Sequence, residues 1–311
     1  MAEVTAKMVK DLREMTGAGM MDCKKALAET DGDMDKAVEF LREKGLAAAA
    51  KKAGRIAAEG VVKTLVVDDK NAVVVEVNSE TDFVAKNAEF NAYVDEVAKQ
   101  ALASNAASME EFMAESWAAD TSKTVEQQLS SMVARIGEKL SIRRYEKILN
   151  ADCVVSYVHG EGKIGVLVEA KASVVNDEVK EALKNIAMQI AALNPKYVST
   201  DEVSEEYKAH EMEILKAQIA NDPKFAGKPD KVIEGAVSGR LNKELKEVCL
   251  LEQVYVKAED GKQTVGQYVA QVAKSTGSDL SIKKFVRLER GEGMEKKEEN
   301  FAEEVAKQMG M

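Results

Sequence analysis

Apolar positions recur at helical spacing over the first 45 residues and predict three short helices. The first covers residues 4–15, the second 21–29 and the third 35–44, with Asp33 as N-cap and Gly45 at its end. Helices this short are unstable alone, so we expect their apolar stripes to meet in a compact bundle spanning residues 1–45. The positions expected to face inward are Val4, Met8, Val9, Leu12, Cys23, Ala26 and Leu27.

Runs of β-branched and apolar residues predict two pairs of strands further along the chain. The first pair covers residues 61–67 and 73–77, and the second covers 154–159 and 164–170. Helical patterns follow each pair, the first of them over residues 88–103. The chain therefore repeats an order of two strands followed by helices.

A repeated string supports an internal duplication. Residues 136–145 read IGEKLSIRRY and residues 276–285 read TGSDLSIKKF. We expect an α+β fold with a duplicated two-lobed core, in which each half is a small antiparallel sheet with helices on one face. The expected halves are residues 61–150 and 151–290, joined to the N-terminal bundle by a basic, alanine-rich linker over 46–60.

Two charged helical segments stand outside the duplication. Residues 202–219 and 228–246 flank a turn that contains proline and glycine, and they predict an antiparallel helical hairpin inserted at about 200–247. The residues leave open whether it serves self-association, contact with a partner or neither. A last amphipathic helix is expected over residues 301–309, within a C-terminal module at 291–311.

Composition narrows the class of protein. The chain of 311 residues is 45% hydrophobic with a formal net charge of −10, which argues against a nucleic-acid binder. Three widely spaced cysteines, Cys23, Cys153 and Cys249, form no disulfide or zinc pattern and fit a reducing compartment. The first residues are charged and no long apolar stretch occurs, so we expect a cytoplasmic protein without a membrane span. We expect Cys153 and Cys249 to be buried.

Catalytic patterns are sparse. Neither His159 nor His210 has a candidate nucleophile, which disfavours a hydrolase of the Ser/His or Cys/His type. Residues 160–165 match the dinucleotide pattern G-x-G-x-x-G, but a predicted strand follows where a helix is required. We interpret this string as a β-turn with His159 at its tip. A nucleotide-binding enzyme that uses it is the disfavoured alternative, and we expect no cofactor or metal.

The heptapeptide TDFVAKN, residues 81–87, lies between a predicted strand and a predicted helix. It places the aromatic Phe83 beside the carboxylate Asp82 on a connecting segment. An apolar side chain there either marks a docking point or folds back into its own core. The residues alone leave both possibilities open.

Several strings together resemble those of one family, bacterial elongation factor Ts, the guanine-nucleotide exchange factor for elongation factor Tu. The resemblance runs from the N-terminal bundle to the C-terminal helix. One departure is Gln253-Val254-Tyr255, where the family often has a Pro-Phe pair. The matching strings are residues 16–27, 52–55, 57–60, 81–87, 156–168 and 264–267.

The resemblance implies a protein-binding function without covalent chemistry. The chain would bind elongation factor Tu with GDP, promote GDP release by disturbing the magnesium and phosphate site, and allow GTP to reload. It also implies a ubiquitin-associated-like (UBA-like) N-terminal bundle, a hairpin that acts as a coiled coil or dimerisation module, and a docking C-terminal helix. A homodimer or a two-to-two complex is possible on this basis. A structural oligomer built through the hairpin would leave the Phe83 motif without a role.

The same resemblance implies which residues contact the partner. Thr81, Asp82, Phe83 and Val84 would reach the region of the bound magnesium ion, with Phe83 as a wedge. A second set would make the remaining contacts. It comprises Arg13, Met20 and Met21 from the N-terminal bundle, Ile136 and Gly137 from the repeated string, and His159 from the second strand pair.

Overall fold

Three helices form the N-terminal bundle in the computed structural model, which describes residues 4–16 and 18–295. They are α1 (Ala6–Thr16), α2 (Met20–Glu29) and α3 (Met34–Lys52). The Asp33 side chain accepts a hydrogen bond from the Lys36 N–H, which confirms the predicted N-cap. The inward positions are also confirmed, since Leu12, Cys23 and Leu27 are completely buried.

The predicted end of the third helix at Gly45 is wrong, because α3 continues to Lys52. Residues 46–52 are mostly alanine and lysine, which favour a helix, and this outweighs the cost of one glycine. Gly45 lies where α3 packs against a helix of the core: a Cβ added there would be 3.6 Å from the Ser130 carbonyl oxygen. The glycine therefore marks a close helix contact.

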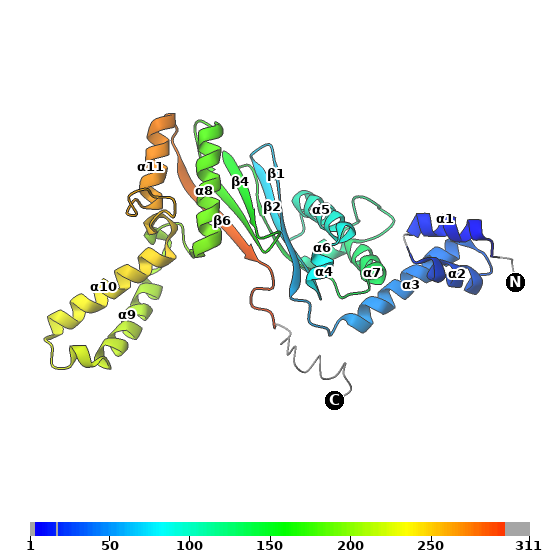
Figure 1. Ribbon diagram of the computed structural model, residues 1–311, viewed down its shortest axis with the longest axis horizontal. Helices are drawn as coiled ribbons and strands as arrows, with labels where there is room; N and C mark the ends of the chain where they lie inside the picture. Colours follow the sequence, from blue (N-terminus) through cyan, green and yellow to red (C-terminus); the bar gives the residue numbers. More distant parts are fainter. Residues whose placement is uncertain (1–3, 17, 296–311) are drawn as a thin grey trace.

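The first half of the core is a three-stranded antiparallel sheet with helices on one face (Figure 1). Its strands follow the order β1-β2-β3, and its helices bury one face of β2 together with Phe90 and Phe112. The elements are β1 (Glu59–Val67), β2 (Asn71–Ser79), α4 (Asp82–Ala85), α5 (Ala88–Ala103), α6 (Met109–Ala114), α7 (Val125–Ile136) and β3 (Ser141–Ile148).

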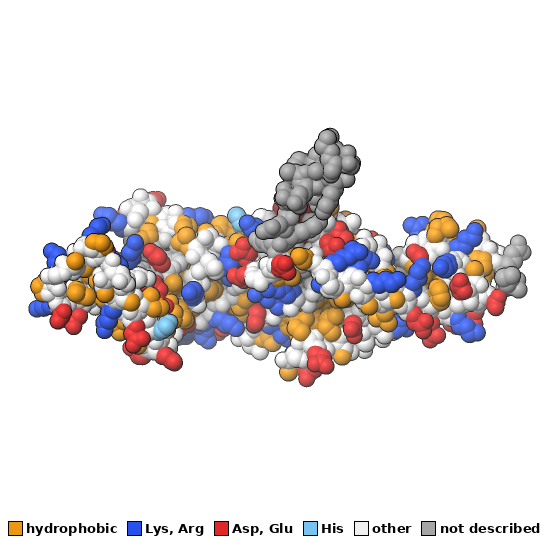
Figure 2. Space-filling model, turned by 90° about the horizontal axis from the view of Figure 1, so that it is seen from below, with side chains coloured by type: hydrophobic (Ala, Val, Ile, Leu, Met, Phe, Trp, Pro, Cys, Tyr) orange, Lys and Arg blue, Asp and Glu red, His pale blue; other side chains and the backbone are white. Residues whose placement is uncertain are grey.

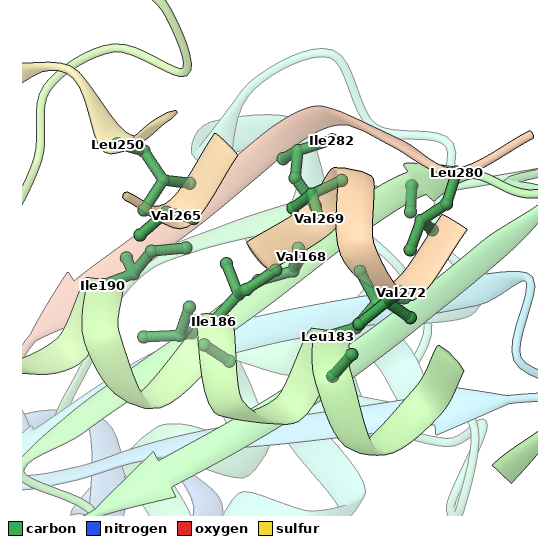
Figure 3. Close-up of a cluster of buried hydrophobic side chains, with 14 of the residues drawn as sticks. Val168, Leu183, Ile186, Ile190, Leu250, Val265, Val269, Val272, Leu280 and Ile282 are labelled. Atoms are coloured by element: carbon green, nitrogen blue, oxygen red, sulfur yellow. The ribbon is translucent and has the colours of Figure 1, made fainter. Parts of the chain in front are cut away.

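The second half repeats this plan with sheet order β4-β5-β6. Figure 3 shows its core, in which side chains of α8 and α11 meet the strands, among them Ile186, Val269 and Val168. The elements are β4 (Cys153–His159), β5 (Ile164–Lys171), α8 (Asp177–Leu193), α11 (Val265–Thr276) and β6 (Ser281–Glu289).

The structure confirms the internal duplication. Both α7 and α11 begin at a threonine, Thr124 or Thr264, that forms a capping box with the glutamine three residues later. Both helices end at a left-handed glycine, Gly137 with φ 86° or Gly277 with φ 67°, and the last strand of each half follows. Positive φ favours glycine, which explains why the repeated string keeps it.

The two sheets pack against each other through the faces that their helices leave open. This contact buries Val62 and Val74 of the first sheet against Val154, Leu167 and Val286 of the second. The layers therefore run helix, sheet, sheet, helix (Figure 1). The sequence predicted helices on one face of each sheet but not what covers the other.

The helical hairpin is present in the second half and extends from it (Figure 1). Helices α9 (Glu205–Ala220) and α10 (Asp230–Val248) bury their own apolar residues between them, and short 3₁₀ turns lie before, between and after them. Its base is closed by the hydrogen bond from the Leu250 N–H to the Tyr197 carbonyl, 2.9 Å long. The 3₁₀ turns are η1 (Thr200–Glu202), η2 (Pro223–Phe225) and η3 (Leu250–Glu252).

Two further expectations concern the cysteines and the C-terminus. Cys153 and Cys249 are completely buried, as predicted. The helix predicted over residues 301–309 lies outside the described residues. Within residues 4–16 and 18–295, no helix is both long enough and apolar enough to cross a membrane.

Candidate functional site

Phe83 is 82% exposed at the start of the one-turn helix α4. The hydroxyl of Thr81 caps this turn by accepting a hydrogen bond from the Val84 N–H. Val84 and Ala85 are buried in the core of the first half, so they anchor the turn. Of the two possibilities that the sequence left open, the structure shows the exposed one.

The neighbouring Asp82 is paired within the same turn. Its carboxylate accepts a hydrogen bond from the Lys86 ammonium at 2.9 Å, and this bond lowers the pKa of Asp82. Asp82 is therefore ionised at neutral pH. The turn presents an aromatic ring beside a negative charge whose partner lies one helical turn away.

Ile136 and Gly137 lie beside this turn because Glu138 connects the two segments. The carboxylate of Glu138 accepts hydrogen bonds from the backbone N–H groups of Glu80 and Thr81. Sequence reasoning missed Glu138, although it follows the glycine of the repeated string. The Ile136 side chain is partly buried in the first-half core, while Gly137 is exposed.

His159 ends β4, and Tyr157 holds its ring through a hydrogen bond between Oη and Nδ1, 2.9 Å long. The turn that follows His159 packs against the first sheet, where the Val62 N–H donates to the Gly162 carbonyl at 2.7 Å. A shallow pocket is lined by Lys86 from the α4 side and Glu161 from the turn. The structure thus brings the His159 turn next to the Phe83 turn.

The glycine string at residues 160–165 has a packing role. It leads into β5 and not into a helix, so the structure contradicts the dinucleotide-site alternative. Gly162 has a φ of 93°, and a Cβ on Gly165 would lie 2.5 Å from a methyl carbon of Val62. The glycines allow the two sheets to approach. Within the described residues, no group of three or more His, Cys, Asp or Glu side chains is arranged to hold a metal.

Comparison with known proteins identifies the family. The family model described as elongation factor TS matches residues 80–292. Elongation factor Ts of Clostridioides difficile (strain 630) is 55% identical over 310 residues, which cover 99% of this chain and 100% of that protein. Elongation factor Ts of Clostridium novyi (strain NT) is 54% identical over 308 residues, which cover 98% and 99%. The chain belongs to the elongation factor Ts family.

Membership of the elongation factor Ts family confirms the resemblance drawn from the sequence and identifies a translation elongation factor. The matched region begins at Glu80, directly before the Phe83 turn. It includes His159 and both copies of the repeated string, residues 136–145 and 276–285. It excludes the N-terminal bundle, which the alignments with the full-length relatives include.

The N-terminal bundle also has exposed side chains at the positions predicted to contact a partner. Met20 and Met21 at the start of α2 are exposed, as are Arg13 and Met15 near the end of α1. Sequence reasoning missed Met15. Arg13 and Met15 line a pocket together with Arg135 of α7, the core helix that ends at Ile136, so this end of the bundle lies beside the core.

Charge on the surface is mixed. On the face shown in Figure 2, basic and acidic side chains are interspersed along the molecule. A nucleic-acid binder typically carries a continuous basic face. On the face shown in Figure 2, acidic side chains interrupt the basic ones.

Proposed function

We propose that this chain is the guanine-nucleotide exchange factor of elongation factor Tu. It binds the GDP form, promotes GDP release and allows GTP to reload, and it needs no covalent chemistry, cofactor or metal of its own. The observation that carries the proposal is Phe83, an aromatic side chain that is 82% exposed on a braced turn in a member of the elongation factor Ts family.

The mechanism follows from differential binding. A GTPase holds GDP through magnesium and through backbone N–H groups around the phosphates. Phe83 and Asp82 act as a wedge that displaces this region of the partner. Linkage is reciprocal, so a surface that fits the nucleotide-free partner better must weaken nucleotide binding by the same factor. Burial of one aromatic side chain contributes about 1.5–3 kcal/mol, or roughly ten- to hundredfold in affinity.

The other predicted contact residues have distinct roles in this proposal. Ile136 and Gly137 extend the contact around Phe83, and His159 touches the partner further from the phosphates. Thr81 and Val84 support the turn from within the chain, since the Thr81 hydroxyl is hydrogen-bonded and Val84 is buried. A further set docks the N-terminal bundle on the nucleotide-binding domain of the partner. It consists of Arg13, Met20 and Met21.

The proposal extends to assembly and location. The N-terminal bundle is UBA-like, and the hairpin of α9 and α10 is a coiled-coil module for self-association. A homodimer or a two-to-two complex with elongation factor Tu is the corresponding assembly. Protein synthesis places the chain in the cytoplasm, and neither a nucleic acid nor a membrane is a partner.

The test follows the release of labelled GDP from elongation factor Tu. The native chain should accelerate release, and Phe83→Ala should reduce the acceleration by about ten- to hundredfold at a subsaturating concentration of the factor. Phe83→Ala should leave the free energy of unfolding within about 0.5 kcal/mol, because the ring is exposed. Leu193→Ala, which truncates an apolar side chain that is 47% exposed in the second half, is the control. Absence of acceleration by the native chain would contradict the proposal.

A further inference from the structure

Residues 80–81, which lead into the Phe83 turn, lie next to residues 137–139. A carboxylate from each segment accepts hydrogen bonds from the backbone of the other. The Glu138 carboxylate accepts hydrogen bonds from the Glu80 N–H at 3.1 Å, the Thr81 N–H at 3.0 Å and the Thr81 hydroxyl at 2.7 Å. In return, the Glu80 carboxylate accepts one from the Lys139 N–H at 2.6 Å. Each turn therefore satisfies backbone donors of the other.

The segment after α3 joins the same group. The Arg55 guanidinium donates to both oxygens of Glu80, at 3.1 and 3.3 Å. The Lys139 ammonium donates to the Arg55 carbonyl oxygen at 2.8 Å. We call Arg55, Glu80, Thr81, Glu138 and Lys139 together the turn clamp. Glu138 makes three of its hydrogen bonds to the segment that carries Phe83.

The position of Phe83 depends on this support. A single helical turn does not hold itself together in water, and the exposed ring has little packing of its own. The Thr81 hydroxyl has one hydrogen, which it donates to Glu138, so its lone pairs remain available to cap the Val84 N–H. Glu138 thus fixes the orientation of the cap as well as the path of the backbone.

The second half of the chain supplies an internal comparison. Ser278 occupies the position of Glu138 in the repeated string, and its hydroxyl accepts from the Val174 N–H and donates to the Val174 carbonyl, both at 3.1 Å. A short hydroxyl side chain is therefore enough to join the two turns in this fold. The longer carboxylate occurs in the half that carries Phe83, where it accepts from two more donors, the Glu80 N–H and the Thr81 hydroxyl.

We propose that Glu138 is a positioning residue for nucleotide exchange, which holds the Phe83 turn in its docking geometry before the partner arrives. The effect of Glu138 on nucleotide exchange rests on the proposed function, whereas the hydrogen bonds of the turn clamp do not depend on it. A preorganised turn loses less conformational freedom on binding, so docking is tighter and faster.

The first experiment measures amide hydrogen exchange in the free chain. Glu138→Ala should accelerate exchange at residues 80–86 by about tenfold or more, because local opening becomes easier. Glu138→Gln should give an exchange rate between those of the native chain and Glu138→Ala. Its remaining oxygen still accepts from the backbone, but its amide nitrogen cannot accept from the Thr81 hydroxyl. Ser278→Ala, the matched change in the other half, should leave residues 80–86 unchanged. Unchanged protection in Glu138→Ala would overturn the proposal, whatever the chain does to GDP release.

The second experiment is a double-mutant cycle on stimulated GDP release. Glu138→Ala should lower the acceleration about tenfold in the native background and have almost no effect when Phe83 is already alanine. An equal loss in both backgrounds would show that Glu138 acts through general stability, and it would overturn the positioning role. If the native chain does not stimulate release, the proposed function fails, and the hydrogen-exchange result still decides whether the clamp exists.

Discussion

Glu76 is a completely buried carboxylate at the centre of a polar cluster that joins distant parts of the chain. Arg143 and Arg144 donate to its two oxygens, and the N–H of Gly291 donates at 2.8 Å. Burial by itself raises the pKa of Glu76, but these donors together lower it below the ordinary value of 4.5. The cluster fixes the path of the chain after β6.

This balance predicts a pH-dependent contribution to stability. A carboxyl with a lower pKa in the folded state stabilises the fold above its unfolded pKa, and the contribution disappears as the pH falls through the folded value. Glu76→Gln should therefore lower the free energy of unfolding by about 2–3 kcal/mol near neutral pH, and the difference should shrink as the pH falls below about 4.5.

Urea unfolding at a series of pH values from about 7 to 3 measures this difference. Glu96→Gln is the control, because Glu96 forms an exposed pair with Lys99 and contributes little. A stability difference that stays constant across the pH series would contradict the ionisation argument for Glu76.

The sequence could single out Phe83 but not Glu76 or Glu138. An aromatic residue on a connecting segment is a local feature, whereas the two carboxylates acquire their roles from partners far along the chain. Glu76 lies 67 positions from Arg143 and 215 from Gly291. Before the fold is known, both carboxylates resemble ordinary solvated residues.

At the scale of the element, substitutions of Gly45 test the contact between α3 and α7. An added Cβ at this position meets the Ser130 carbonyl at 3.6 Å, which is ordinary contact. Gly45→Ala should therefore stabilise the chain by about 0.5–1 kcal/mol through its helix propensity. Gly45→Leu should force α3 away from α7, lower the Tm and increase the radius of gyration measured by small-angle X-ray scattering.

Gly235→Ala is the matched control, because Gly235 lies in α10 with no atom near its Cβ position. It should gain stability in the same way as Gly45→Ala. If Gly45→Leu were as stable and compact as Gly45→Ala, the two helices would not need the glycine to pack.

The hairpin of α9 and α10 predicts a thiol experiment. Cys249 is buried in the apolar cluster of the hairpin, and burial raises the pKa of its thiol, so it should react slowly in the native chain. Replacing residues 204–246 with a short Gly-Ser linker should leave the two-sheet core folded, since Tyr197 and Leu250 hold the base of the hairpin together. Cys249 should then react quickly with a thiol probe while Cys153 stays protected.

The far-ultraviolet circular dichroism of the deletion variant checks that the core is retained. Rapid labelling of Cys153 in this variant would show that the hairpin supports the core of the second half. Slow labelling of Cys249 would show that the hairpin does not shield it.

Elements were predictable where the apolar period is regular, and less so where composition misleads. The helix over residues 88–103 was predicted with the bounds that α5 has in the structure. The end of α3 was misplaced because an alanine-rich, basic run looks like a linker when a glycine precedes it. The alanine and lysine residues of this run favour a helix, and α3 also packs against α7.

At the scale of the whole molecule, the two halves are joined face to face through their sheets. The duplication was readable from the repeated string, but the pairing of the faces was not. One feature could have indicated it: residues 72–75 form a continuous apolar run, and all of them are buried. Continuous runs of this kind are typical of strands covered on both faces.

Gly165 lies at this contact between the two sheets. Substituting it tests how much the close packing of the halves stabilises the chain. Its missing side chain leaves room for Val62 and Val74, whose methyl carbons would be 2.5 and 3.0 Å from an added Cβ. Gly165→Ala should push the sheets apart and lower the free energy of unfolding by about 1–3 kcal/mol, measured by urea denaturation. Gly239→Ala, at an uncrowded helical position, should not destabilise the chain.

A second substitution separates overcrowding from other causes. Val62→Ala removes the methyl group that clashes first, at the cost of a cavity of its own. If the clash explains the loss, the two substitutions should not be additive. The free energy of unfolding of the double variant should then exceed the additive expectation by about 1 kcal/mol or more. Strict additivity would mean that Gly165 is required for another reason, such as the backbone geometry of β5. Because the His159 turn and the Phe83 turn belong to different sheets, the same crowding should also disturb their alignment and reduce stimulated GDP release.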